Sequence, residues 1–248
     1  MSTRRQLAWV GPLLVAAVGF AGCSDSNADA EGAGQDESAP PAPKPGRTLF
    51  TDPLDDDRNG WALPDNHLGS MEYVDGDFVW HSKEPNLRPH LLAAPIADQF
   101  DAGTLEMQDV VVTADVTSAR GAAAMGVFCR EVTDTDADFQ WYEFVVRDGY
   151  AAIRHADSAG RLELLAETKT LDIPDGAKTS VQAACVDDEQ GRAQLWLSVD
   201  GATTLHTTVD DGLGNGAAGL QAYDAPEGAT AGRFVIRWHE FTVSEPAG

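Results

Sequence analysis

Hydrophobic and polar residues alternate along much of the chain, and the pattern is clearest in residues 125–155. Alternation with a period of two is typical of antiparallel strands that have one face on a core. The residues on the inferred core face are Met125, Val127 and Cys129 in a first strand and Tyr142, Phe144 and Val146 in a second. Asp148-Gly149 then predicts a two-residue hairpin turn into a third strand, because this pair accepts positive φ values. These three strands are the predicted centre of the fold.

Similar alternating runs follow one another from Arg47 onward, and no convincing helical period accompanies them. The predicted strands cover residues 47–51, 70–74, 77–82, 104–118, 122–131, 138–147, 150–155, 161–166, 178–186, 192–200, 203–209, 216–223 and 232–244. Asp75-Gly76 and Asp200-Gly201 supply further tight turns between strands. Many antiparallel strands of this length predict an all-β fold, a jelly-roll sandwich of two sheets.

Residues 1–22 have the features of an export signal. Arg4 and Arg5 precede an apolar run that ends at Gly22. The run is shorter than the roughly 20 residues that a membrane-spanning helix needs, so a signal peptide is predicted. The paired arginines fit both the general and the twin-arginine export routes, and the sequence leaves that choice open.

The signal is followed by a candidate lipid-attachment site and a tether. Phe20-Ala21-Gly22-Cys23 resembles the lipobox of bacterial lipoproteins, with Phe20 in place of the usual leucine. The resemblance implies that Cys23 carries the lipid; the alternative is a plain secreted protein. Residues 23–46, rich in acidic residues, Ala, Ser, Gly and Pro, predict a disordered tether. We therefore expect a folded domain over 47–248, held by lipid on the extracytoplasmic side of the cell membrane.

Cys129 and Cys185 both lie in predicted strands. Export places them in an oxidising compartment, where a pair of cysteines in a folded domain favours a disulfide. The alternative is two buried free thiols.

The net charge of the chain limits its partners. Its 17 Lys and Arg residues face 40 Asp and Glu residues, which gives a formal charge of −23. Nucleic acids and anionic lipid surfaces would be repelled. Contact with a membrane is therefore expected only through the lipid at Cys23.

The order of motifs along residues 47–244 resembles the concanavalin A-like (LamG-like) jelly-roll modules of bacterial surface proteins. The motifs are Asn59-Gly60-Trp61, Tyr73-Val74-Asp75-Gly76, Gly126-Val127-Phe128-Cys129-Arg130, Tyr142-Glu143-Phe144, Asp148-Gly149-Tyr150, Leu195-Trp196-Leu197-Ser198-Val199-Asp200-Gly201 and Phe241-Thr242-Val243. The resemblance implies the jelly-roll fold and extracellular binding, often of glycans.

The carboxylates of the chain do not match the catalytic pattern of the glucanases in that superfamily. Those enzymes place their carboxylates on one strand as Glu-x-Asp-x-x-Glu. Glu143 is the only carboxylate in residues 140–147, and Glu106 and Asp109 have the wrong spacing for one strand face. We therefore expect no retaining glucanase of this type, and no cofactor is predicted.

One acidic segment has a metal-like pattern. Residues 55–60 match the opening of a calcium loop, with Asp55, Asp57 and Asn59 as the candidate ligands. The twelfth position is Asn66 and not the glutamate of an EF-hand. The two interpretations are a structural calcium site and a solvated acidic turn that leads into Trp61.

The candidate ligand contacts are Trp141, Glu143 and Arg147, which share the strand face opposite the inferred core. An aromatic ring beside a carboxylate and a guanidinium is the usual inventory of a sugar-binding groove. We expect this face to be exposed, so that replacing Trp141 would leave stability nearly unchanged. The alternative is an ordinary cross-strand pair or a covered sheet edge.

These observations predict a cell-surface lipoprotein with a non-catalytic module that binds a glycan or another cell-envelope polymer. Two alternatives belong to other classes. One is a glycoside-processing enzyme of a jelly-roll family with a nonstandard carboxylate set. The other is a protein-interaction module without a small ligand.

Overall fold

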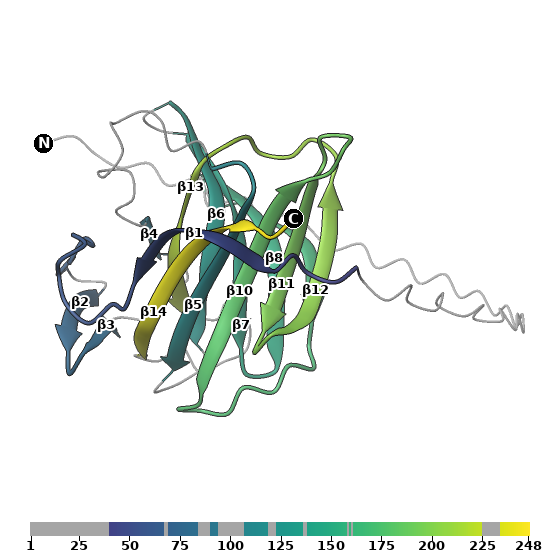
Figure 1. Ribbon diagram of the computed structural model, residues 1–248. Helices are drawn as coiled ribbons and strands as arrows, with labels where there is room; N and C mark the ends of the chain where they lie inside the picture. The colour runs from purple at the N-terminus through teal and green to yellow at the C-terminus, as the bar shows by residue number, and fades with distance from the viewer. Residues whose placement is uncertain are drawn as a thin grey trace, which may run out of the picture. The chain divides into compact units, whose positions relative to one another are not determined.

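The computed structural model describes residues 40–66, 69–83, 90–93, 107–118, 123–135, 138–157, 159, 161–224 and 234–248, and in these residues the chain is all-β without a helix (Figure 1). Fourteen strands lie in the described part: β1 (Pro45–Asp52), β2 (Gly69–Val74), β3 (Asp77–Ser82), β4 (His90–Ala93), β5 (Val110–Ser118), β6 (Ala123–Thr135), β7 (Asp138–Arg147), β8 (Tyr150–Asp157), β9 (Leu162–Thr168), β10 (Lys178–Asp187), β11 (Ala193–Val199), β12 (Ala202–Val209), β13 (Ala217–Asp224) and β14 (Val235–Pro246). No helix in the same part is long and apolar enough to cross a membrane.

The strands form two antiparallel sheets packed face to face. The eight-stranded sheet has the order β12-β11-β10-β5-β14-β3-β2, and β1 pairs with the second half of β14. The six-stranded sheet has the order β4-β13-β6-β7-β8-β9. Strands that are neighbours in a sheet are thus often far apart in the sequence, as jelly-roll connections require. The predicted jelly-roll sandwich is confirmed.

The core lies between the two sheets, where the alternating hydrophobic residues of both meet. From the six-stranded sheet, β6 and β7 contribute all six residues that the alternation predicts: Met125, Val127, Cys129, Tyr142, Phe144 and Val146. From the eight-stranded sheet, Leu197 in β11 and Trp238 in β14 are among the buried residues. Burial of these side chains supplies the main favourable contribution to folding.

Two details of the strand prediction differ from the structure. Strand β4, which pairs with β13, is not among the predicted strands. At the turn between β7 and β8, only Gly149 has a positive φ, of 72°, whereas Asp75 and Asp200 have positive φ values like the glycines that follow them. The Asp148 carboxylate instead accepts a hydrogen bond from the Ile173 backbone nitrogen, at 3.4 Å. This contact from the β9–β10 connection accompanies the different turn geometry.

The segment before β1 belongs to the folded domain, which corrects the predicted end of the tether. Strand β1 begins at Pro45, and the residues before it lie against the eight-stranded sheet. The indole nitrogen of Trp196 donates a hydrogen bond to the Pro40 carbonyl at 3.0 Å, and the Ala42 nitrogen donates to Thr203 Oγ1 at 3.2 Å. Residues 40–46 are therefore ordered. The predicted signal, Cys23 and the rest of the tether lie outside the described residues.

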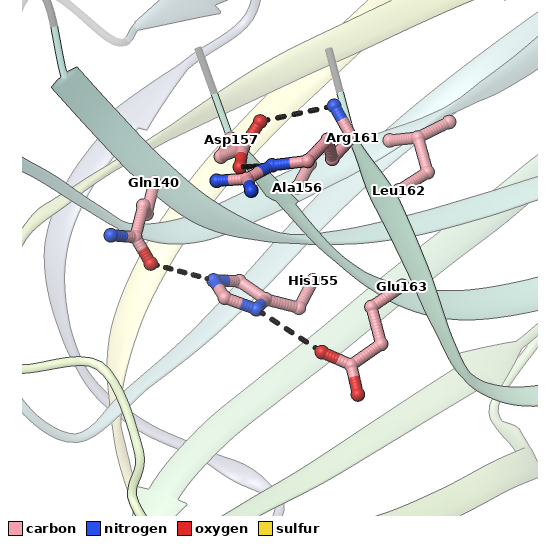
Figure 2. A pocket seen from close by; sticks show the side chains of 7 residues that line it. All are labelled: Gln140, His155, Ala156, Asp157, Arg161, Leu162 and Glu163. Atoms are coloured by element: carbon pink, nitrogen blue, oxygen red, sulfur yellow. Dashed lines mark hydrogen bonds and ion pairs between the residues drawn. The ribbon is translucent and has the colours of Figure 1, made fainter. Parts of the chain in front are cut away.

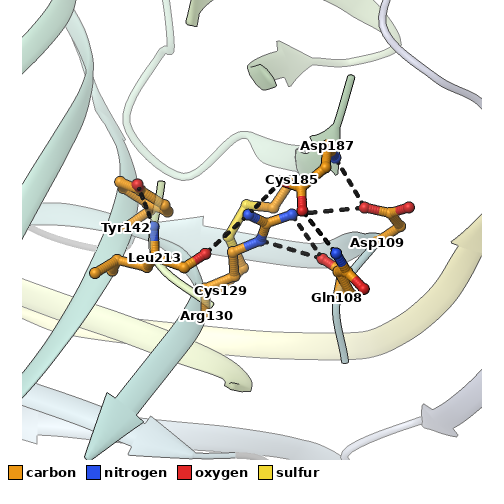
Figure 3. The surroundings of a disulfide bond; sticks show 8 residues. All are labelled: Gln108, Asp109, Cys129, Arg130, Tyr142, Cys185, Asp187 and Leu213. Carbon is orange, nitrogen blue, oxygen red and sulfur yellow. Dashed lines mark hydrogen bonds and ion pairs between the residues drawn. A yellow bond between two sulfur atoms is a disulfide. The ribbon is translucent and has the colours of Figure 1, made fainter. Parts of the chain in front are cut away.

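The predicted disulfide between Cys129 and Cys185 is confirmed (Figure 3). Cys129 lies in β6 of the six-stranded sheet and Cys185 lies in β10 of the eight-stranded sheet. The bond therefore crosses the core and joins the two sheets covalently.

Arg130 adds a polar cross-link beside the disulfide. It lies at a β-bulge of β6, with a φ of 53°, and is 1% exposed. Its guanidinium donates to the carbonyls of Gln108 and Leu213 at 2.9 Å, and it forms an ion pair with Asp187 at 2.7 Å. A bulge can re-aim a side chain in this way, because the extra residue breaks the alternation. Arg130 thus ties β6 to the segment just before β5, to β10 and to the β12–β13 connection.

Candidate functional site

Polar side chains gather on the face of the six-stranded sheet that points away from the shared core, which we call the outer face. In β7, the residues that alternate with the core residues Tyr142 and Phe144 place Trp141 and Glu143 on this face. In β8, Arg154 lies directly opposite Glu143 and alternates with the core residue Ile153. The predicted division of the strand into two faces is therefore confirmed.

The outer-face cluster, as we define it, consists of Trp141, Glu143, Tyr150, Arg154 and Gln221. Arg154 Nη1 forms an ion pair with Glu143 Oε1 at 3.1 Å, and Arg154 Nη2 donates to the Tyr150 hydroxyl at 2.9 Å. Gln221 comes from β13, two strands away from β7, and its amide nitrogen donates to Glu143 Oε2. Glu143 thus receives hydrogen bonds from two strands on opposite sides.

Burial sets the electrostatics of this cluster. Glu143 and Gln221 are both 0% exposed. Burial raises the pKa of Glu143, and the hydrogen bonds and the charge of Arg154 offset this rise only in part. Burial therefore disfavours the charged form of Glu143 in the folded protein, and shifted pKa values of this kind cluster at functional sites.

Two polar atoms of the cluster, Trp141 Nε1 and Gln221 Oε1, are buried without a hydrogen-bond partner in the described residues. A buried amide oxygen without a partner is costly, and such an atom calls for an explanation by a water molecule or a ligand. A hydroxyl group that donates a hydrogen bond would satisfy it.

The structure corrects the expected exposure of the predicted contact residues. Trp141 is 3% exposed and packs in an apolar cluster with Phe128, Phe139 and Ala156, so it does not form an open platform. Glu143 is likewise buried. Only Arg147 of the three predicted residues is partly exposed, and its guanidinium lies 5.0 Å from the centre of the Tyr150 ring. Alternation identifies the face of a residue, but it does not show what covers that face.

Three residues of the cluster were not predicted, namely Tyr150, Arg154 and Gln221. Arg154 and Tyr150 could have been found from the hairpin register, because a two-residue turn at 148–149 places Arg154 opposite Glu143. Gln221 could not, because β13 reaches its position beside β6 through a long connection between distant parts of the chain.

The acidic segment at 55–60 is held by its own arginine. Arg58 forms ion pairs with Asp55 at 3.0 Å and with Asp56 at 2.6 Å, and the Asp57 carbonyl accepts a hydrogen bond from the Gly60 nitrogen at 3.0 Å. Within the described residues, no group of three or more His, Cys, Asp or Glu side chains could hold a metal ion. The predicted calcium site at Asp55, Asp57 and Asn59 has only two side chains of these four types, because Asn59 would bind through its amide oxygen. This site stays a prediction.

No protein-family model matches the chain, and no curated protein matches its sequence. Its structure is similar to that of a Bacillus subtilis protein of unknown function with a galectin-like fold, with a TM-score of 0.57, 15% identity, and coverage of 82% of this chain and 98% of that one. It is also similar to the carbohydrate recognition domain of Emp46p, as a point mutant (TM-score 0.52, 11% identity, 82% and 96% covered) and in a metal-free form (TM-score 0.51, 10% identity, 82% and 96% covered). These likenesses show a galectin-like jelly-roll fold.

Replacing Trp141 tests whether this ring is a structural residue. Trp141→Ala should lower the free energy of unfolding by about 3–5 kcal/mol, because a buried aromatic side chain leaves a cavity that its neighbours fill only partly. Leu164→Ala is the matched control on the neighbouring edge of the same face, where Leu164 is 50% exposed, and its effect should stay within about 0.5 kcal/mol. Urea denaturation measures both. Equal effects of the two variants would contradict the burial of Trp141.

The raised pKa of Glu143 predicts a dependence of stability on pH. Above its ordinary pKa of 4.5, the unfolded chain releases the Glu143 proton more readily than the folded chain. The free energy of unfolding of the wild type should therefore fall relative to Glu143→Gln as the pH rises from 4.5 through the raised pKa, and the difference should be constant below this window. Urea denaturation of both chains at several pH values measures it, with equal m-values as the control. A relative rise would contradict the direction of the shift.

Proposed function

We propose that the protein is a glycan-binding module and that the glycan contacts the outer face of the six-stranded sheet. The observation that carries this proposal is the outer-face cluster, in which a charged residue is buried on the side of the sheet away from the core. Replacing such a pair by apolar residues is often neutral or stabilising, so stability alone does not explain it. A role in ligand binding explains why this buried pair is present.

The accessible contacts on this face are Tyr150 and Arg147 at the rim of the cluster. Two guanidinium groups lie over the ring of Tyr150, with Arg147 at 5.0 Å and Arg154 at 5.6 Å from its centre. Sugar rings stack on aromatic faces, and guanidinium groups donate hydrogen bonds to hydroxyl and carboxylate oxygens. Arg154 donates to the Tyr150 hydroxyl and Glu143 binds Arg154, so both act as positioning residues.

The fold supports the same proposal. The similar solved structures include a carbohydrate recognition domain, whose fold is similar to that of the present chain. A rigid sheet that positions a few polar groups beside an aromatic ring is also the general form of a small-molecule site.

The outer-face cluster fits binding better than hydrolysis. A carboxyl group with a raised pKa is a property of general acids in glycosidases. Hydrolysis also needs a second carboxylate, at about 5–9.5 Å from the first. The outer-face cluster contains one carboxylate, Glu143, and this carboxylate is engaged by Arg154 and Gln221.

A glycan-array screen of the chain, followed by affinity measurements on the glycan that it retains, tests the proposed site. Tyr150→Ala and Arg147→Gln should each weaken binding by about tenfold or more, because they remove central contacts, and Arg147→Gln should leave the free energy of unfolding nearly unchanged. Arg192→Gln is the matched control, because it removes the same charge from the β10–β11 connection. Retention of no glycan, or an equal effect of Arg192→Gln and Arg147→Gln, would contradict the proposal.

We also propose that the module is anchored to the cell membrane through a lipid on Cys23, as the lipobox-like residues 20–23 indicate. Cys23→Ser should move the protein from the membrane fraction to the soluble fraction, because the thiol that takes the lipid is lost. Cell fractionation with immunodetection measures this change, and Ser24→Ala is the control. A mature chain whose intact mass shows an unmodified Cys23 would contradict lipid attachment.

A further inference from the structure

A half-open pocket lies at one end of strands β7, β8 and β9 (Figure 2). It is at the opposite end of the β7–β8 ladder from Arg147 and Tyr150. Its volume is about 340 Å³, which lies at the small end of the roughly 300–1,000 Å³ typical of small-molecule sites. The lining residues are Gln140, His155, Ala156, Asp157, Arg161, Leu162 and Glu163. Five of them carry side-chain groups that donate or accept hydrogen bonds.

The hydrogen bonds of His155 leave two acceptors facing each other. Gln140 Oε1 lies 2.9 Å from His155 Nε2, so we assign the ring proton to Nε2. The other ring nitrogen, Nδ1, then accepts hydrogen bonds, and it faces Glu163 Oε2 at 3.6 Å. The position between Nδ1 and the carboxylate is suited to a group that donates to both.

The charges of the pocket favour a cation at this position. Asp157 and Arg161 neutralise each other through an ion pair at 2.6 Å. In the described residues, Glu163 has no Lys or Arg within ion-pair distance, and its side chain is 72% exposed. The pocket therefore carries an unbalanced negative charge, in a chain with a formal charge of −23.

We propose that this pocket binds a hydroxylated primary amine of the amino-sugar class. The ammonium group donates hydrogen bonds to His155 Nδ1 and to the Glu163 carboxylate, which are charge-assisted bonds on an accessible surface. The hydroxyl groups reach the Gln140 amide and the Asp157 carboxylate.

The pocket is separate from the proposed glycan site on the outer face. Along β8, His155 and Asp157 alternate with Arg154 and Ala156, so His155 and Arg154 point to opposite faces of the sheet. The two proposals can therefore fail independently. A variant of Tyr150 tests one site and a variant of Glu163 tests the other.

Isothermal titration of the chain with glucosamine, N-acetylglucosamine and glucose tests the pocket. Glucosamine should bind saturably, and the other two sugars should bind at least about tenfold more weakly, because neither carries an ammonium group to donate charge-assisted hydrogen bonds. Glu163→Gln should weaken glucosamine binding by a similar factor, since it removes the charge from an exposed side chain without changing its size. Glu189→Gln, the matched control on the exposed β10–β11 connection, and Tyr150→Ala should both bind glucosamine as the wild type does.

Several outcomes would overturn the pocket proposal. They are the absence of saturable glucosamine binding, equal affinity for glucosamine and glucose, and equal effects of Glu163→Gln and Glu189→Gln. Loss of glucosamine binding in Tyr150→Ala would indicate that the amine binds on the outer face, and this result would also overturn the pocket proposal. A chain that binds glucosamine in this pocket but retains no glycan on the array would keep this proposal and contradict only the outer-face site.

Discussion

The cross-link between the two sheets, made by the Cys129–Cys185 disulfide and by Arg130, is the constraint on which the rest of the structure depends (Figure 3). Hydrophobic contact between two sheets is not directional, so by itself it does not determine which strands face each other. The disulfide closes a separation of 56 residues, which stabilises the fold by roughly 4 kcal/mol in the chain-entropy model. Arg130, buried beside it, would be strongly destabilising without the Asp187 carboxylate. Together they determine the position of β6 against β10.

The position of β6 in turn brings the outer-face cluster together. Strand β6 lies between β13 and β7, so Gln221 and Glu143 reach each other across it. Gly126 pairs with Gln221 in this sheet, and a Cβ atom at Gly126 would lie 1.9 Å from the Phe144 carbonyl oxygen. A side chain there would therefore push β7 away from β6. The glycine keeps the strands close and leaves the polar contact above them unobstructed.

The sequence predicts the fold better than it predicts the site, and the reason is physical. A period of two reports which residues share a face, and it correctly separates Tyr142 and Phe144 from Trp141 and Glu143. It does not report what else packs on that face, so the exposure expected for Trp141 is wrong. The strand pairing that brings Gln221 to Glu143 joins residues 78 positions apart, and no local pattern encodes it. Strand β4 is missed for a related reason, because a four-residue edge strand has too few positions to show alternation.

The amine pocket follows from the same ladder that builds the core. Successive pairs between β7 and β8 are Val146 with Ala151, Phe144 with Ile153, Tyr142 with His155, and Gln140 with Asp157. All four pairs lie on the core-facing side, and they change from fully buried apolar residues to partly exposed polar ones along the strands. The apolar core between the sheets therefore ends where these pairs become polar. The six-stranded sheet itself extends beyond the end of the core. Because the polar pairs continue a ladder that is anchored in the core, His155 and Gln140 are held in place before a ligand arrives. Such preorganisation lowers the entropy that binding must overcome.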